Sequence, residues 1–127
     1  MEKKDLDWGN IGFSYMPTDK RYVANYKDGA WDEGGMTSDP NVVINECAGI
    51  LQYCQECFEG LKAYTTEDGS IVTFRPDLNA ERMMDSAARL EMPPFPKERF
   101  LEAVDAVVKA NAAWVPPFGS GATLYLR

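Results

Sequence analysis

Two of the three cysteines have a spacing that could support redox or zinc chemistry. Cys54 and Cys57 form a Cys-x-x-Cys pair, and Cys47 is the remaining thiol of the chain. A redox site usually has its first cysteine at a helix N-terminus after a strand, and structural zinc needs two further ligands. Only Cys47 is available as a further ligand, so we favour a chance spacing and leave a redox role open.

Two other segments could bind an anion. The backbone N–H groups of Gly119-Ser120-Gly121 could cradle one, although a turn before a strand is the interpretation that we favour. Arg82, Ser86 and Arg89 share one face of a predicted helix, and that triplet taken alone favours a solvated face. The sequence contains no histidine, which excludes Ser-His, Cys-His and His-metal chemistry within the chain, and we predict no metal site.

Composition limits the classes of partner. The chain has 13 basic and 20 acidic residues and a net charge of −7, so we expect no nucleic-acid partner. It contains no apolar run of about 18 residues and no apolar signal-peptide core, so we predict no membrane association and a cytoplasmic location. Its length of 127 residues fits one domain.

A hairpin followed by a helix is the unit around which the candidate residues must be positioned. Residues 61–66 and 70–75 are rich in β-branched and aromatic side chains, and Asp68-Gly69 between them is typical of a type I′ turn. Pro76 suits the first position of a helix predicted over 76–90.

Weaker patterns fill the rest of the chain. Apolar residues at helical spacing predict a second helix over 97–112. Residues 34–40 read as a loop, and residues 45–57 have room for one helical turn. Short strands or extended segments are predicted at 11–16, 20–26, 30–33, 41–44 and 122–127. A second Asp-Gly pair, Asp28-Gly29, lies between 20–26 and 30–33 and repeats the hairpin pattern.

These elements indicate an α+β fold, with a mostly antiparallel sheet and two helices packed on one face. We expect residues 1–10 to be a flexible segment and residues 11–127 to form the domain. Because residues 124–127 read as the interior of a strand with no polar tail after it, we expect the chain to be the front portion of a longer protein.

Three strings closely resemble the branched-chain amino acid aminotransferases, which are class IV, fold-type IV enzymes dependent on pyridoxal phosphate. The resemblance runs from about Phe13 to the C-terminus and is specific, because the motifs recur in one order. They are YCQECFEGLKAY at 53–64, FRPDLNAERM at 74–83 and WVPPFGSGATLYLR at 114–127. The resemblance implies the small N-terminal domain of the D-amino acid aminotransferase-like fold, without the large catalytic domain.

The resemblance also implies roles for individual residues. Phe58 and Tyr125 resemble walls of the pocket for the aliphatic side chain of the substrate. Arg127 resembles a residue that helps to bind the carboxylate of glutamate or 2-oxoglutarate. Tyr53 resembles the tyrosine that reaches into the active site of a neighbouring subunit, which implies a homodimer. Phe13 is a further, looser match to a substrate-binding residue.

For the cofactor, pyridoxal 5′-phosphate, the resemblance assigns the phosphate to Arg82, whose planar fork of donors suits a dianion. The family reaction transfers the amino group of leucine, isoleucine or valine to 2-oxoglutarate and needs a lysine that members carry in the large domain. None of the lysines here matches that motif, so we expect no catalytic residue in this chain, no activity alone and no Schiff base with added cofactor. The alternatives are another class IV enzyme, such as a D-amino acid aminotransferase or an aminodeoxychorismate lyase, or a non-catalytic binding or dimerisation module.

Overall fold

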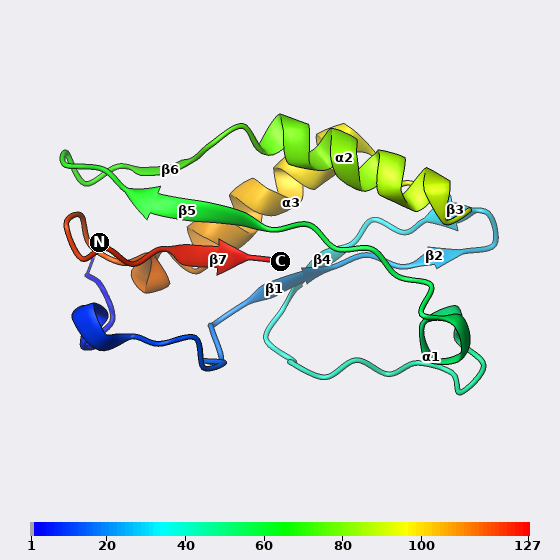
Figure 1. Cartoon of the computed structure of the whole chain (residues 1–127), viewed down its shortest axis with the longest axis horizontal. Helices are drawn as coiled ribbons and strands as arrows, with labels where there is room; N and C mark the ends of the chain where they lie inside the picture. Colours follow the sequence, from blue (N-terminus) through cyan, green and yellow to red (C-terminus); the bar gives the residue numbers. More distant parts are fainter. Residues whose placement is uncertain (1) are drawn as a thin grey trace.

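The computed structural model describes residues 2–127, which form short strands, three α-helices and two 3₁₀ turns (Figure 1). In chain order the elements are η1 (Trp8–Asn10), β1 (Arg21–Val23), β2 (Tyr26–Lys27), β3 (Ala30–Trp31), β4 (Gly35–Thr37), α1 (Gly49–Tyr53), β5 (Leu61–Thr65), β6 (Ile71–Thr73), α2 (Pro76–Arg89), α3 (Lys97–Ala110), η2 (Ala112–Trp114) and β7 (Leu124–Leu126).

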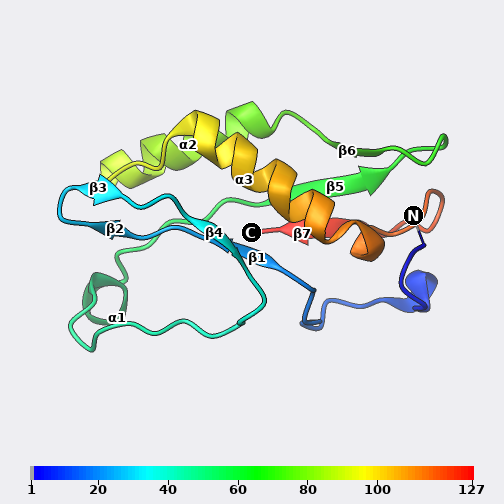
Figure 2. The ribbon, with the colours of Figure 1, turned by 180° about the vertical axis from the view of Figure 1, so that it is seen from behind.

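The strands pair in three small antiparallel sheets. The largest has the order β6-β5-β7, and the others are the pairs β1-β4 and β2-β3. Helix α3 crosses behind β5 and β7 in Figure 1 and in front of them in Figure 2, and α2 lies beside α3, beyond the end of β6. The predicted α+β class, with antiparallel strands and two main helices, is confirmed, and the strands are divided among separate sheets.

The central hairpin lies where it was predicted, but its turn is of another type. Gly69 has a φ of +83°, whereas Asp68 is not among the residues with positive φ, as a type I′ turn would require. The N–H of Gly69 donates to the carbonyl of Thr66 at 2.9 Å, which is a type I turn followed by a left-handed glycine. The Asp68 carboxylate accepts the N–H of Ser70 at 3.1 Å, and this local bond favours the conformation with negative φ.

Helix α2 begins at Pro76, as the sequence predicted, directly after a left-handed residue. Arg75 has a φ of +47°, and its guanidinium forms two bonds of 2.9 and 2.7 Å with the carboxylate of Asp77 in the first turn. This pair lies at the junction between β6 and α2, and the helix continues beyond the end of β6 (Figure 1).

The β2-β3 hairpin has the type I′ geometry that Asp-Gly predicts, with φ of +53° at Asp28 and +85° at Gly29. Trp31 attaches this hairpin to the start of α3. Its ring meets Phe95 edge to face at a centroid distance of 5.0 Å, and its indole N–H donates to the Pro94 carbonyl at 3.1 Å. Arg99 adds hydrogen bonds to the backbone carbonyls that follow Trp31.

The core is small and is built mostly from alanine and branched aliphatic side chains. Its buried members are Leu61, Ala63, Ala80, Ala87, Ala112 and Val115. Asn111 is also buried, with 2% of its surface exposed. Its amide accepts the N–H of Lys20 at 3.0 Å and donates to the carbonyls of Lys20 and Val107 at 2.8 and 2.9 Å. A buried polar side chain of this kind joins the end of α3 to the segment that enters β1.

Several weaker predictions were wrong in detail. Residues 11–16 form no strand, and β4 lies inside the stretch 34–40 that was predicted to be a loop. The flexibility expected of residues 1–10 stays a prediction, and one contact of this segment with the domain is the hydrogen bond from the N–H of Lys4 to the carbonyl of Ala113 at 2.9 Å. Within residues 2–127, no helix has the length and apolar character needed to cross a bilayer.

Candidate functional site

Arg82 projects from the middle of α2 toward the segment that leads into β5. Its Nε and Nη2 donate to the two carboxylate oxygens of Glu59 at 2.5 and 2.7 Å, which makes a bidentate pair. The side chain of Glu59 is only 5% exposed, whereas that of Arg82 is 68% exposed. The carboxylate is therefore buried at the base of the pair, and the guanidinium extends outward from it.

Asn79 completes this network, which we call the Glu59 network (Glu59, Asn79 and Arg82). Asn79 lies three residues before Arg82 and so on the same helix face. Its Nδ2 donates to Glu59 at 2.8 Å and to the carbonyl of Gly60 at 3.2 Å. Hydrogen bonds from Arg82, followed by those from Asn79, hold the pKa of the Glu59 carboxyl below its usual range despite burial. Glu59 is therefore ionised at neutral pH.

Gly60 is the point at which the Glu59 network meets β7. A Cβ on Gly60 would lie 2.6 Å from the hydroxyl oxygen of Tyr125 and 2.9 Å from a carbon of its ring. Tyr125 stands opposite Lys62 in the β5-β7 pairing. The Tyr125 ring therefore rests against the backbone of Gly60, and only glycine leaves room for it.

Three of the residues that were assigned to the substrate, Phe58, Tyr125 and Arg127, are placed by strand alternation on one face of the sheet. Leu61 and Ala63 are buried under the helices, so strand alternation puts Phe58 and Gly60 on the opposite face. Tyr125 is on that open face because it pairs with Lys62, and Arg127 follows two residues later. Phe58 is 80% and Tyr125 52% exposed, so both side chains are available to a ligand or to another polypeptide.

Arg82 and Tyr125 thus approach the same short segment from two sides. Arg82 contacts Glu59 from the helix side, and Tyr125 contacts Gly60 from the open face. The remaining predicted residues are not joined to them. Tyr53 ends α1 and is 85% exposed, and Phe13 is fully exposed in the segment before β1. The assigned roles of all six residues stay predictions.

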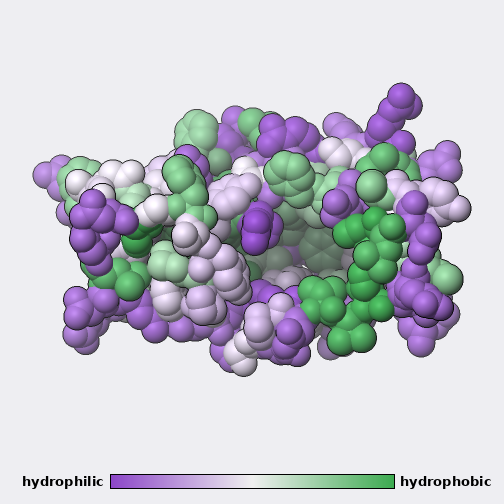
Figure 3. Space-filling model, turned by 60° about the horizontal axis from the view of Figure 1, so that its bottom comes forward, coloured by the Kyte–Doolittle hydropathy of each residue, from purple (hydrophilic) through white to green (hydrophobic). Residues whose placement is uncertain are grey.

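The open surface is hollowed and partly apolar. Figure 3 shows a depression in the centre of one face, with hydrophobic residues lining its floor and gathering at one side of it. Large apolar side chains that are more than half exposed include Phe13, Val42, Val43, Leu51, Tyr53, Phe58, Phe74, Phe118 and Tyr125. Single exposed apolar side chains are common on protein surfaces, whereas a contiguous apolar patch beside a depression, as in Figure 3, is typical of contact with a ligand or with another polypeptide.

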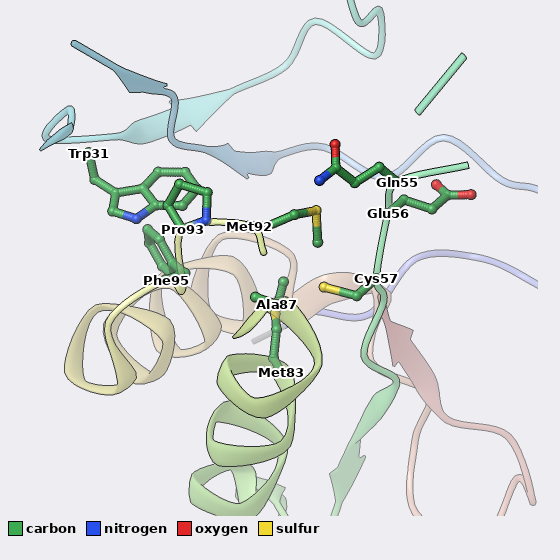
Figure 4. Close-up of a pocket in the computed structure, with 9 residues that line it drawn as sticks. All are labelled: Trp31, Gln55, Glu56, Cys57, Met83, Ala87, Met92, Pro93 and Phe95. Carbon is green, nitrogen blue, oxygen red and sulfur yellow. The ribbon is translucent and has the colours of Figure 1, made fainter. Parts of the chain in front are cut away.

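A cavity of about 360 Å³ lies near the C-terminal end of α2. Figure 4 shows that Trp31 and Phe95 form one side of it and that Met83, Met92 and Cys57 face it from other sides. The lining is mostly apolar, and no ion pair of residues 2–127 includes one of its side chains. The cavity has the character of an apolar recess and not of a catalytic site.

The Cys-x-x-Cys pair lacks the placement of a redox centre. Cys54 follows the C-terminal end of α1 with a φ of +52°, whereas a redox cysteine is usually at a helix N-terminus. All three cysteines are free thiols. No three histidine, cysteine or acidic side chains within residues 2–127 are grouped as metal ligands.

Sequence reasoning overlooked Glu59, Gly60 and Asn79 as site residues. All three lie inside the motifs that carried the family resemblance, but none was given a role. The spacing of Asn79 and Arg82 was the available signal, because residues three apart share a helix face. Their common partner is 20 or more residues away, so only the fold reveals it.

Known proteins match the chain over almost all of its length. A branched-chain-amino-acid aminotransferase of Haemophilus influenzae is 59% identical over 124 residues, which are 98% of this chain and 36% of that protein. The enzyme of the same name from Helicobacter pylori is 48% identical, also over 98% of this chain and 36% of its own length. The chloroplastic branched-chain amino acid aminotransferase 2 of Humulus lupulus is 44% identical over 100% of this chain and 31% of its own.

The chain thus spans about a third of the length of the curated relatives that it matches. No protein-family model matches it. Identities of this size across 124 or more aligned residues are evidence of common ancestry and a common fold. The chain is therefore homologous, over nearly all of its own length, to a segment of the branched-chain-amino-acid aminotransferases.

Proposed function

We propose that this chain is the small N-terminal domain of a branched-chain amino acid aminotransferase that transfers the amino group of leucine, isoleucine or valine to 2-oxoglutarate. The observation that carries the proposal is the identity of 44 to 59% to such enzymes along the whole chain. An exposed arginine and an open aromatic face at the same short segment support it.

The residues present fit the phosphate of pyridoxal 5′-phosphate. A guanidinium has five N–H donors, and Arg82 uses two of them on Glu59, so its outer edge is available to a phosphate. When bound, the cofactor supplies the electron sink for amino-group transfer. Arg82 binds the phosphate and fixes one end of the cofactor, while the reactive lysine comes from a large domain outside this chain.

The open face of the sheet forms part of the substrate pocket in this proposal. Phe58 and Tyr125 provide apolar surface for a branched aliphatic side chain, and Arg127 helps to bind the second carboxylate of glutamate or 2-oxoglutarate. Tyr53, on the exposed end of α1, reaches a neighbouring subunit in a homodimer. The chain therefore binds and orients, and it has no catalytic activity by itself.

The test uses the complete gene product and its Arg82→Ala variant. We expect transamination between leucine and 2-oxoglutarate, and we expect the variant to need on the order of 100-fold more pyridoxal phosphate for half-maximal activity, the scale for losing a charge-assisted contact. At saturating cofactor the KM for leucine should change little, because Arg82 contacts the cofactor and not the substrate. Absence of transamination, or an unchanged cofactor requirement, would contradict the proposal.

A further inference from the structure

Glu59 is unusual among the ion-paired carboxylates that the structure describes. In the other four ion pairs of residues 2–127, both side chains are at least 32% exposed. In the Glu59–Arg82 pair the side chain of Glu59 is 5% and that of Arg82 is 68% exposed. A buried charge needs compensation, and both oxygens of Glu59 receive it from α2.

Glu59 occupies one edge of the Arg82 guanidinium and so determines which edge is left free to bind an anion. Nε and Nη2 form the side edge of the group, and this edge faces Glu59. The outer edge, which consists of Nη1 and the second hydrogen of Nη2, has no acceptor among residues 2–127. Two parallel donors on one edge are the arrangement that binds two oxygens of a phosphate.

A free arginine side chain samples many rotamers, and binding an anion would have to fix them. Glu59 removes much of this freedom before the anion arrives, because both of its oxygens fix the plane of the guanidinium. Asn79 fixes Glu59 in turn through the bond to Oε2 and holds the adjacent peptide through the carbonyl of Gly60. The orientation of Arg82 is thus set by a buried carboxylate that does not itself reach the outer edge.

Orienting Arg82 should raise phosphate affinity, whereas the negative charge of Glu59 should lower it, because a carboxylate repels a nearby phosphate. The repulsion is limited by geometry, since the guanidinium stands between the two anions and is itself largely exposed to water, which screens it. Orientation and repulsion therefore predict opposite effects of removing Glu59 on phosphate affinity. This difference makes the role of Glu59 testable.

We propose that Glu59 is a positioning residue for phosphate binding, which holds the side edge of Arg82 so that the outer edge is presented to the phosphate of the cofactor. This inference rests on the proposed function, because it requires Arg82 to bind that phosphate. It assigns to the glutamate of the Phe-Glu-Gly motif a role in cofactor affinity. Asn79 supports the same role through its bond to Glu59.

The test compares pyridoxal phosphate with pyridoxal, which lacks the phosphate, in the complete gene product. Dissociation constants for both are measured for the parent protein and for the Glu59→Gln, Glu59→Asp and Arg82→Ala variants. Glu59→Gln keeps the shape but loses one of the two acceptors for Arg82. We expect it to raise the dissociation constant about 10-fold for pyridoxal phosphate and less than 2-fold for pyridoxal. Glu59→Asp keeps the charge on a shorter side chain, so we expect a smaller loss that is again specific for the phosphate.

Asp77→Asn is the matched control. It removes the carboxylate partner of another bidentate arginine, Arg75, from the same helix without touching the Glu59 network. We expect the control to leave the ratio of the two dissociation constants unchanged. In an Arg82→Ala background, Glu59→Gln should produce no further loss of phosphate affinity, because Glu59 acts only through Arg82.

Three results would overturn the inference alone while Arg82→Ala still weakens the phosphate ligand selectively. The first is an equal loss of affinity for both ligands in Glu59→Gln, which indicates a merely structural role. The second is that both affinities are unchanged in that variant. The third is tighter binding of pyridoxal phosphate, which indicates that repulsion dominates. If Arg82→Ala does not distinguish the two ligands, the phosphate assignment of the proposed function fails, and this inference fails with it.

Discussion

Replacing Gly60 by alanine should displace Tyr125 and lower activity without unfolding the protein. The new Cβ would lie 2.6 Å from the hydroxyl oxygen and 2.9 Å from a ring carbon of Tyr125. Restoring an ordinary contact of 3.4 Å requires the ring to move by roughly 0.8 Å, and a misplacement of about 1 Å can reduce catalysis by on the order of 100-fold. We therefore expect kcat/KM for leucine to fall between about 10- and 100-fold.

Stability should change much less than activity. Tyr125 is 52% exposed, so its ring can move toward solvent instead of straining the backbone, and Gly60 does not have a positive φ. We expect the free energy of unfolding to change by less than about 1 kcal/mol, as is usual for a substitution that creates neither a cavity nor a buried unpaired group.

The assay uses the complete gene product, since the proposed activity needs it, and measures kcat/KM and the urea midpoint for Gly60→Ala, with Gly35→Ala as the control. A Cβ at Gly35 meets no atom within 4 Å, and its φ is not positive, so that change should leave both quantities unaltered. If Gly60→Ala acts through the Tyr125 ring, it should have no further effect in a Tyr125→Ala background. An equal loss of kcat/KM in both backgrounds would refute the steric explanation.

Two further predictions concern stability. The two hydrogen bonds from Arg75 lower the pKa of Asp77 to about 2 in the folded chain, from 3.8. Because this folded-state pKa is lowered, the stabilisation is present above about pH 4 and is lost as the pH falls toward 2. Asp77→Asn should therefore flatten the decline in urea midpoint across that interval. An equally steep decline in the variant would contradict this prediction. Asn111→Ala should lower the free energy of unfolding by about 3 kcal/mol, because it leaves the backbone groups of Lys20 without their partner, whereas the exposed Asn41→Ala should cost little. Equal urea midpoints for these two asparagine variants would show that the buried amide is dispensable.

The sequence predicted the elements whose signals are local. The central hairpin and the start of α2 at Pro76 follow from turn residues and from the fixed φ of proline, and both lie where they were expected. The same Asp-Gly pair gave the correct turn type at Asp28 and the wrong one at Asp68. In the turn at Asp68-Gly69, the Asp68 carboxylate accepts a hydrogen bond from the N–H of Ser70. This local interaction competes with the type I′ conformation, and the Asp-Gly dipeptide alone does not reveal it.

Elements that depend on distant partners were missed. β4 lies in a glycine-rich stretch that has the composition of a loop, and it becomes a strand because β1 pairs with it, with Val23 opposite Gly35. The predicted strand over 11–16 did not form, although its residues have suitable propensities. Propensity in strands is weak when no neighbouring strand supplies the hydrogen bonds.

The candidate site could be predicted only in part, for the same reason. The motifs indicated the family, and they assigned roles to Arg82, Phe58, Tyr125 and Arg127 that stay predictions. They did not indicate that Glu59 is buried beneath Arg82, because this depends on how α2 lies against the segment before β5. A glutamate in a sequence string resembles any exposed acid until its burial is known.

Glu59 and Gly60 are consecutive residues that face opposite sides of one extended segment. No residue can be inserted or deleted there without reversing which side each one faces, so the length of this segment is as constrained as its composition. The peptide between them also links the two halves of the site mechanically. A shift of this segment would therefore change the contact with Arg82 on the helix side and the contact with Tyr125 on the open face together.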